Sequence, residues 1–308
     1  MSSKRPKIIY VMGGHHIGST VLGVTLGNCQ GCFFAGEVHS WFTKHGLPAY
    51  RHEAALRFWE EVSANVQNGA ELFGDDTELY LDRSSALRLS RLRRWPTTRR
   101  ELRPPYRRAT EELYRAIANA AGAENIIDSS HYPLRARELQ SLDGIDLYLV
   151  FLVRDPQGVV ASHDPRSAAG SAKSALITNL HLWATHVLSL LVFLRQPPER
   201  RLFLRHEQFL ADPENVIRQI LDGVESDAAL PDLTALHTGS PLQGNPLLKE
   251  ERVLALRGPP GPPPRPSRMT TLLQAPWTPV FSLLHPAISN GSGAPAPEER
   301  LASSARRA

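Results

Sequence analysis

A glycine-rich stretch near the start of the chain, VMGGHHIGSTVLG at residues 11–23, has the composition of a loop that holds a phosphate group. Its glycines allow the backbone to approach a ligand closely, and the apolar run after Gly18 is typical of a helix. The first turn of a helix offers free N–H groups and the positive end of its dipole, and Ser19 and Thr20 add hydroxyl donors there. The stretch can therefore bind an anion without a lysine or arginine.

The loop differs from the G-x-x-x-x-G-K-[ST] loop of nucleotide hydrolases, because Ile17-Gly18 precede the hydroxyls where that motif has a lysine. A nucleotide kinase-like phosphotransferase would lack its main charge clamp, and no persuasive magnesium-binding aspartate is present. That function is a weaker alternative. On its own, the stretch also fits an ordinary tight turn between a strand and a helix.

A second candidate anion site lies in LVRDPQGVVAS, residues 152–162. Arg154 ends an apolar strand pattern, and Ser162 follows about two helical turns later. An arginine can bind a phosphate with two parallel hydrogen bonds, and a serine at this spacing can donate to the same group. The combination is more specific than the glycine-rich loop alone.

Apolar strands and helices alternate around both stretches. We expect strands at 7–12, 32–35, 125–128, 146–153 and 201–204, and helices at 18–28, 133–141, 155–163 and 171–195. This pattern predicts an α/β fold, a P-loop-like three-layer sandwich with a central parallel sheet flanked by helices. Ligands of such sheets bind beyond the carboxyl ends of the strands, where both candidate sites fall.

The expected organisation is one domain over residues 1–288. A helical insertion occupies about 51–122, where a basic stretch, RLRRWPTTRRELRPP, separates two amphipathic helices. A proline-rich segment at about 256–268 is expected to form a flap, and residues 289–308 have the composition of a disordered tail.

Charge and cysteine content exclude several classes of protein. The chain has 35 basic and 31 acidic residues, a formal charge of +4, which is too small to indicate a nucleic-acid partner. Cys29 and Cys32 are the two cysteines, and without a second ligand pair they do not predict a metal site. No apolar run reaches about 18 residues and no room is left for a signal peptide before residue 7, so we expect no membrane span and a cytoplasmic location.

Several segments together carry a resemblance to one family. GGHHIGST resembles a 5′-phosphosulfate loop written G-x-x-R-S-G-[ST]-T, and VRDPQGVVAS matches the corresponding 3′-phosphate motif. Further matches, in the same order as in bacterial members, are FFAGEVHSW, IIDSSHYPLRA, LRHEQFLADPENVIRQIL, Asn179 followed by Trp183, and GNP at 244–246. The chain thus resembles PAPS-dependent sulfotransferases, of the carbohydrate and tyrosylprotein branch.

The resemblance implies transfer of a sulfuryl group from 3′-phosphoadenosine 5′-phosphosulfate (PAPS) to a hydroxyl or amine, leaving 3′,5′-ADP, with no metal. It assigns the 5′-phosphosulfate to Gly14, His15, His16, Ile17, Gly18, Ser19 and Thr20, and the 3′-phosphate to Arg154 and Ser162. Arg135, Arg166 and Arg205 are weaker candidates for donor contacts.

Glu37 is the candidate general base, since it matches a glutamate with this role in the family. His39 is the competing candidate, because imidazole titrates near the working pH. A salt-bridged structural carboxylate and a surface histidine are the alternatives for these two positions.

Two cationic positions of the family are histidines here. His16 replaces the arginine of the loop, and His131 replaces the lysine of D-S-S-K. In one interpretation the charge of the donor favours imidazolium, so that His16 or His131 becomes an acid that stabilises the leaving oxygen. In the other, the chain is a weakened or non-catalytic nucleotide-binding homologue.

The acceptor is a small molecule, a sugar or a peptide, and the sequence does not determine which. It does not determine whether the chain forms a homodimer either. Abundant arginine suits an acidic acceptor, while a set of early aromatic side chains offers a stacking surface or, more commonly, core: Trp41, Phe42, Phe58 and Trp59.

Overall fold

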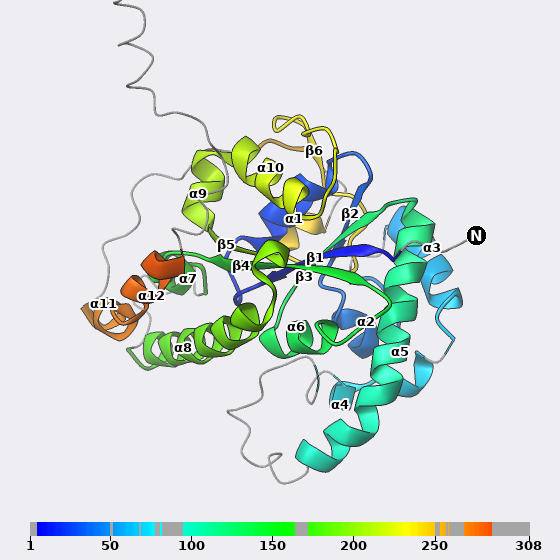
Figure 1. Cartoon of the computed structure of the whole chain (residues 1–308), viewed down its shortest axis with the longest axis horizontal. Coiled ribbons are helices and arrows are strands. Elements are labelled where there is room, and N and C mark those ends of the chain that lie inside the picture. The colour runs from blue at the N-terminus through cyan, green and yellow to red at the C-terminus, as the bar shows by residue number, and fades with distance from the viewer. Residues whose placement is uncertain are drawn as a thin grey trace, which may run out of the picture.

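A five-stranded parallel sheet forms the centre of the computed structural model, which describes residues 5–49, 52–67, 69–77, 81, 95–163, 172–249, 253–256, 258 and 268–284. Its strands, in chain order, are β1 Lys7–Met12, β2 Cys32–Gly36, β3 Asn125–His131, β4 Asp146–Val153 and β5 Arg201–Arg205. The order across the sheet is β2-β3-β1-β4-β5, and every neighbouring pair is parallel. The predicted α/β fold with a covered parallel sheet is confirmed (Figure 1).

Helices cover both faces of the sheet (Figure 1). The helices that precede the carboxyl half of the chain are α1 Ser19–Gly27, α2 Ser40–Thr43, α3 Glu53–Ala64, η1 Ala70–Leu72, α4 Asp75–Thr77, α5 Trp95–Ala121, α6 Pro133–Leu139 and α7 Pro156–His163. Those that follow are α8 Ala172–Arg195, η4 Pro198–Arg200, α9 His206–Ala211, α10 Pro213–Gly223, η5 Pro246–Leu248, α11 Arg268–Gln274 and α12 Trp277–Leu284. A short antiparallel pair, β6 Leu236–His237 and β7 Val253–Leu254, lies outside the main sheet.

The alternation of side chains along β1 separates two hydrophobic cores. Ile8, Tyr10 and Met12 belong to the core shared with α5, α6 and α8, whereas Ile9 and Val11 belong to the core shared with α1, α9 and α10. Successive residues of a strand point to opposite faces, so a strand buried on both sides must be apolar throughout. This explains why β1 and β4 read as unbroken apolar runs.

The order of the strands reverses at β1, which lies between β3 and β4 although both come later in the chain. Met12 at the end of β1 pairs with Phe151 of β4 and with His131 of β3. The segments that leave these three strands therefore meet at one edge of the sheet, which is where ligands bind in folds of this kind.

One expectation within the region 51–122 is wrong. The basic stretch does not separate two helices, because α5 begins at Trp95 and continues through Pro104 and Pro105. Proline removes a backbone hydrogen bond, but tertiary contacts hold the helix on both sides of the pair. Before it, Arg103 donates to the buried Glu138 at 2.7 Å; after it, Tyr106 is fully buried.

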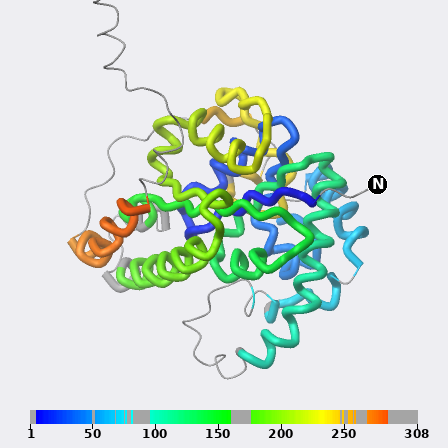
Figure 2. Tube along the Cα trace, viewed as in Figure 1, coloured from blue at the N-terminus to red at the C-terminus, as the bar shows by residue number. Residues whose placement is uncertain are grey.

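No helix or strand after β5 is predicted from the sequence. One of the helices found there, α12, packs on the core that contains β5 and α8. Phe281 stacks on Phe203 of β5, and His186 of α8 meets both Trp277 and Phe281 edge to face. The tube in Figure 2 shows α11 and α12 beside the first half of α8. The proline-rich segment at 256–268 lies mostly outside the described residues, and the tail at 289–308 lies wholly outside them.

Burial lowers the pKa of His186 from 6.5 to about 4, which makes the packing of α12 on α8 acid-sensitive. The unfolded chain binds this proton below about pH 6.5, whereas the folded chain binds it only near pH 4. The contribution of neutral His186 to the free energy of unfolding is therefore complete above pH 6.5, and it is lost as the pH falls from 6.5 to 4. We expect the free energy of unfolding in urea to fall by about 3 kcal/mol more in the native protein than in His186→Phe between pH 7 and pH 4.

His181→Phe is the matched control, since His181 is exposed on the same helix. It should retain the acid sensitivity of the native protein. Equal acid sensitivity in the His186→Phe variant would contradict the assignment of this effect to His186.

Candidate active site

A cavity of about 350 Å³ lies at the carboxyl edge of the sheet, where β1, β3 and β4 end. It is lined by Gly14, His15, His16, Gly18, Ser19, Thr20, Val21, Glu37, His131, Arg154, His206, Gly244, Asn245 and Pro246. Segments that are far apart in the sequence therefore supply one set of polar groups. Most of the residues assigned to the donor from the sequence are in this list.

The loop between β1 and α1 depends on its glycines. A Cβ on Gly13 would lie 1.9 Å from the carbonyl oxygen of Leu152, so only glycine lets the loop pass this close to β4. Gly18 caps α1 in the left-handed conformation, with φ of 91°. Helix α1 starts at Ser19, so its first N–H groups face the same cavity as the hydroxyls of Ser19 and Thr20.

Within the loop, the side chains of neighbouring residues point in different directions. His15 and His16 line the cavity, and His16 has a φ of 60°, which is uncommon outside glycine. Ile17 is 1% exposed and packs in the core beside α1, so any contribution it makes to an anion site comes from its backbone. The apolar anchor at Ile17 turns the two histidines outward.

Arg154 follows β4 and reaches the loop. Its guanidinium donates to the carbonyl oxygen of His16 at 3.0 Å. Gly158, one turn into α7, leaves room for this side chain, because a Cβ there would lie 2.9 Å from Nε of Arg154. The pairing of β1 with β4 thus brings the two candidate anion sites of the sequence together.

Glu37 also lines the cavity, directly after β2. Its carboxylate accepts a hydrogen bond from Nε2 of Gln243 at 3.2 Å, and its N–H donates to the carbonyl of Gln243 at 2.9 Å. Gly36 makes this approach possible, since a Cβ there would lie 2.3 Å from the Gln243 carbonyl oxygen. The Gly244-Asn245-Pro246 turn is held over the cavity by these contacts.

His39, the alternative base, does not line the cavity. It is 2% exposed, and its ring packs edge to face against Tyr132 at 4.8 Å between centroids. His131 lies between this cluster and the cavity, with its ring 4.2 Å from that of His15 and 6.2 Å from that of His39. Of the two candidate bases, the structure brings only Glu37 to the cavity.

The end of β3 is held by a buried carboxylate, Asp128. It accepts hydrogen bonds from the N–H of Ser130 at 2.8 Å, from the hydroxyl of Tyr114 at 2.5 Å and from Arg135 at 3.4 Å. Ser130 Oγ in turn accepts from the N–H of His39 at 3.1 Å. Arg135 is fully buried in this network and donates to Tyr106 as well, so it supports the site from behind and does not line the cavity.

His206, at the start of α9, is a cavity residue that the sequence analysis missed. Its ring occupies the space beside Gly18, where a Cβ would come within 2.1 Å of it. Burial lowers the pKa of His206, and the nearby charge of Arg154 lowers it further, so the ring is neutral at pH 7. The sequence signal that points to His206 is its position directly after β5, a strand that pairs in parallel with β4.

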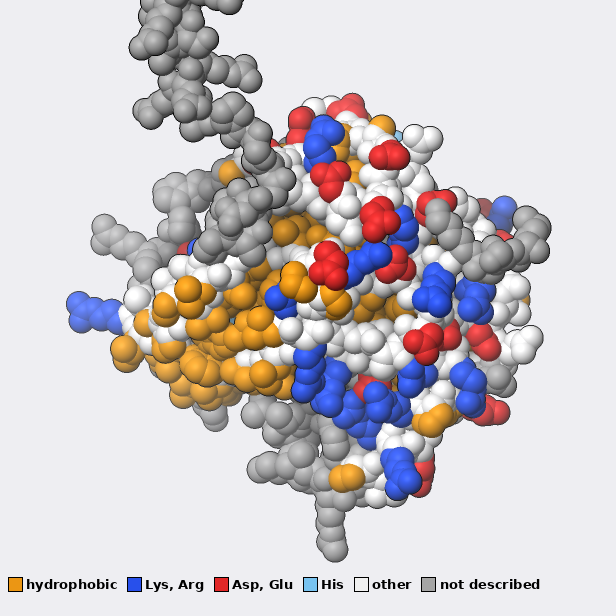
Figure 3. All heavy atoms as spheres, in the orientation of Figure 1, with side chains coloured by type: hydrophobic (Ala, Val, Ile, Leu, Met, Phe, Trp, Pro, Cys, Tyr) orange, Lys and Arg blue, Asp and Glu red, His pale blue; other side chains and the backbone are white. Residues whose placement is uncertain are grey.

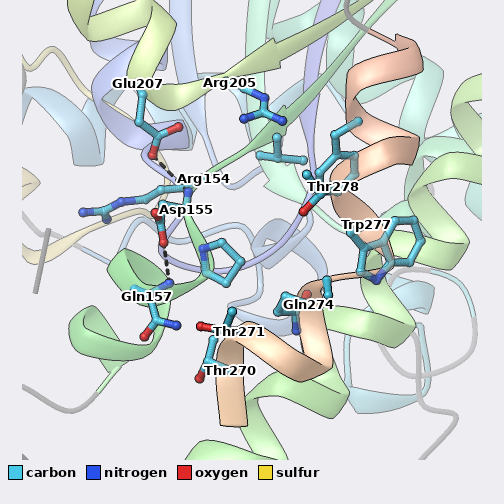
Figure 4. A pocket seen from close by; sticks show the side chains of 14 residues that line it. Arg154, Asp155, Gln157, Arg205, Glu207, Thr270, Thr271, Gln274, Trp277 and Thr278 are labelled. Carbon is cyan, nitrogen blue, oxygen red and sulfur yellow. Dashed lines mark hydrogen bonds between the residues drawn. The ribbon is translucent and has the colours of Figure 1, made fainter. Parts of the chain in front are cut away.

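A second cavity of about 560 Å³ adjoins the first and shares Arg154 (Figure 4). Its wall includes Arg205 and Glu207 on one side and Thr270, Gln274 and Trp277 on the other. Glu207 accepts from the N–H of Asp155 at 2.9 Å, and Asp155 accepts from the N–H of Gln157 at 2.7 Å. Both cavities are partly polar, and Arg154 lines each of them.

Three other expectations have different outcomes. The side chain of Ser162 and all of Arg166 lie outside the described residues. Trp41, Phe42 and Trp59, considered as a stacking surface, are buried in the core. Among the described residues, no group of three His, Cys, Asp or Glu side chains is arranged to hold a metal ion, and Cys29 and Cys32 are unbridged thiols.

Comparison with known proteins bears on the fold. No protein-family model and no curated protein sequence matches the chain. The sulfotransferase domain from the curacin biosynthetic pathway superposes with a TM-score of 0.50 at 16% identity, over 89% of this chain and 98% of that domain. The protein therefore has the fold of a sulfotransferase domain.

Two further sulfotransferase structures are similar over slightly less of the chain. The sulfotransferase domain of the Synechococcus PCC 7002 olefin synthase has a TM-score of 0.41 at 16% identity, over 74% of this chain and 76% of that one. The sulfotransferase from Alicyclobacillus acidocaldarius has a TM-score of 0.38 at 15% identity, over 80% and 88%.

The contact between Gly18 and His206 can be tested by substitution. We expect Gly18→Ala to lower the free energy of unfolding by about 2–4 kcal/mol, because the new Cβ must displace the His206 ring. Gly31→Ala is the control: its φ of 72° is also positive, but nothing lies within 4 Å of the added Cβ, so it should cost only about 1 kcal/mol.

Urea unfolding of both variants, repeated in a His206→Ala background, separates the clash from backbone strain. The cost of Gly18→Ala should fall to that of Gly31→Ala once the ring is absent. Equal costs in the two backgrounds would refute the contact.

Proposed function

We propose that this protein is a PAPS-dependent sulfotransferase that transfers a sulfuryl group to a hydroxyl or amine. The observation that carries the proposal is the convergence of the α1 N-terminus, Arg154 and Glu37 on one cavity. The first two are groups that bind anions, and the third is a carboxylate that lines the same cavity and can accept a proton. The fold shared with a sulfotransferase domain supports the same conclusion.

The donor fits the two adjoining cavities. The 5′-phosphosulfate binds in the smaller one, on the N–H groups of α1 and the hydroxyls of Ser19 and Thr20. The nucleoside and its 3′-phosphate extend into the larger cavity past Arg154, which lines both. On donor binding, the guanidinium exchanges its hydrogen bond to the His16 carbonyl for charge-assisted bonds to phosphate.

In the transfer step, the acceptor oxygen or nitrogen forms a bond to sulfur while the bond from sulfur to the bridging phosphate oxygen breaks. Glu37 takes the acceptor proton, and its hydrogen bond from Gln243 fixes the carboxylate in place. The products are the sulfated acceptor and 3′,5′-ADP. Charge on the leaving phosphate is stabilised by the helix N-terminus, with His16 and His131 beside it.

His206 has a different role from these two histidines. Because its ring is neutral at pH 7, it supplies a hydrogen bond without a positive charge. The donor site therefore depends on backbone N–H groups, hydroxyls and neutral imidazole in addition to Arg154.

A non-catalytic homologue that binds the same nucleotide is the second candidate. The observation in its favour is that, among the described residues that line the smaller cavity, Arg154 is the single arginine and no lysine is present. Incubation with radiolabelled PAPS and a library of sugar, peptide and small-molecule acceptors distinguishes the two. Sulfated product together with 3′,5′-ADP supports the enzyme, whereas tight 3′,5′-ADP binding without turnover supports the binding protein.

The role of Glu37 as base gives a direct prediction. Glu37→Gln keeps the size of the side chain and removes its ability to accept a proton, so kcat should fall by about 10²–10⁴-fold. The affinity for 3′,5′-ADP, measured by calorimetry, should stay within about twofold, since the proposed anion-binding groups are the α1 N-terminus and Arg154 and do not include Glu37.

Glu214→Gln, on the exposed surface of α10, and His39→Gln are the comparison variants. Full activity of the Glu37→Gln protein would reject the assignment. Loss of activity in His39→Gln alone would transfer the role of base to His39.

Arg154 is predicted to dominate donor affinity. Arg154→Met keeps most of the aliphatic stem and removes charge-assisted hydrogen bonds, so the Kd for 3′,5′-ADP should rise by about 10- to 100-fold. Arg218→Met, an exposed position on α10, should leave the Kd unchanged. An unchanged Kd in the Arg154→Met protein would mean that nucleotide does not bind across the two cavities.

A further inference from the structure

Helix α8 exposes a continuous apolar stripe. Its members are Leu176, Ile177, Leu180, Val187, Leu191 and Leu194, whose exposed fractions range from 36% to 53%. Their spacing places them along one side of the helix over its full length. Figure 3 shows a field of apolar side chains over α8 and the neighbouring α11 and α12.

The opposite side of α8 packs against the protein. Leu182, Val192 and Phe193 belong to the cores, and Asn179 and Ser189 are fully buried. Asn179 donates to Thr270 at 3.1 Å, which joins α8 to α11. The segment Leu176–Arg195 is long and apolar enough to span a membrane by length and composition, with 33% of it buried. Because Asn179, His186 and Ser189 are buried against the fold, the geometry favours an interfacial position of α8 over insertion across a bilayer.

A cluster of arginines adjoins the carboxyl end of the stripe. Four of them, Arg99, Arg100, Arg103 and Arg107, line a groove of about 580 Å³ on α5, and Arg137 of α6 and Arg195 of α8 complete the cluster. Figure 3 shows this band of basic side chains next to the apolar field, on the same face of the molecule.

The positive charge of the arginine cluster is only partly neutralised. The buried Glu138 pairs with Arg99 and Arg103, and it brings one negative charge. Partial burial lowers the pKa of Arg137, and the charges of Arg99 and Arg195 lower it further. Mutual repulsion of this kind marks a place where added negative charge is stabilising.

We propose that the α8 stripe and the arginine cluster form a docking surface for an anionic phospholipid membrane. The stripe enters the boundary between headgroups and acyl chains, and the exposed arginines bind lipid phosphates beside it. A lipid surface has an apolar layer of acyl chains and a charged layer of phosphates. The apolar stripe matches the first layer, and the arginine cluster that borders the stripe matches the second. This inference is independent of the proposed sulfuryl transfer.

Charge favours a lipid surface over a second copy of the chain. Helix α8 contains no Asp or Glu, and it ends in Arg195. Pairing two α8 stripes across a two-fold axis would bury apolar area, but α8 itself would bring no carboxylate to the arginine cluster of either copy. A phosphate-bearing surface satisfies the stripe and the cluster together.

The test is co-flotation of the full chain with vesicles. We expect binding to vesicles of phosphatidylcholine with 30% phosphatidylglycerol, in which about one lipid in three is charged. Binding to phosphatidylcholine alone should be weak, and high salt should abolish binding to the charged vesicles. Leu180→Gln with Leu191→Gln should reduce the affinity more than tenfold. Arg100→Gln with Arg137→Gln should reduce it about 25-fold, at about fivefold for each charge.

The four substituted residues are exposed, and Arg99 and Arg103 keep their pairing with Glu138 in these variants. Val253→Gln is the control, since Val253 is 58% exposed on β7, outside the stripe, and it should bind as the native chain does. Absence of vesicle binding by the native chain overturns the proposal. So does a dimer in analytical ultracentrifugation that Leu180→Gln with Leu191→Gln converts to monomer while vesicle binding is unchanged.

Discussion

The buried carboxylate of Asp128 is the interaction on which the site depends. It lies in the middle of β3 and binds α5 through Tyr114, α6 through Arg135 and its own strand through Ser130. A buried charge is tolerated only when it is paired and hydrogen-bonded, so these elements are held in one arrangement. The N–H of His39 donates to Ser130, which extends the constraint to the turn that carries Glu37. Burial, together with the neighbouring carboxylate, raises the pKa of Tyr114, which keeps its hydroxyl available as a donor.

The reversal of strand order at β1 supplies the other half of the arrangement. Because β1 pairs with β3 and β4 at once, the loop after it meets the residues after both. Close passage of the loop over β4 needs glycine at position 13, and the contact with α9 needs glycine at position 18. The first turn of α1 therefore presents its backbone N–H groups to the cavity in a geometry set by the sheet rather than by any one side chain.

The proposed anion site keeps the α1 N-terminus and Arg154 although histidine stands at two positions where the resembled family has a cation. The α1 N-terminus and Arg154 are fixed by the sheet, and His15, His16 and His131 line the same cavity. His206 also lines it, and burial together with the charge of Arg154 lowers the pKa of this ring. The stripe on α8 is a separate matter: its apolar face remains uncovered although the opposite face is part of the core.

The sequence by itself determined the local features: the five strands, the helix after the glycine-rich loop, and the chemistry available at Arg154 and Glu37. These depend on apolar periodicity and on residue type, which act over short stretches. The tertiary structure alone decided which residues meet. It buried His39 and Arg135, brought His206 into the cavity, and carried α5 through Pro104 and Pro105 by contacts on both sides. Such outcomes depend on packing between distant segments, because burial and partner choice are properties of the assembled core and no local pattern encodes them.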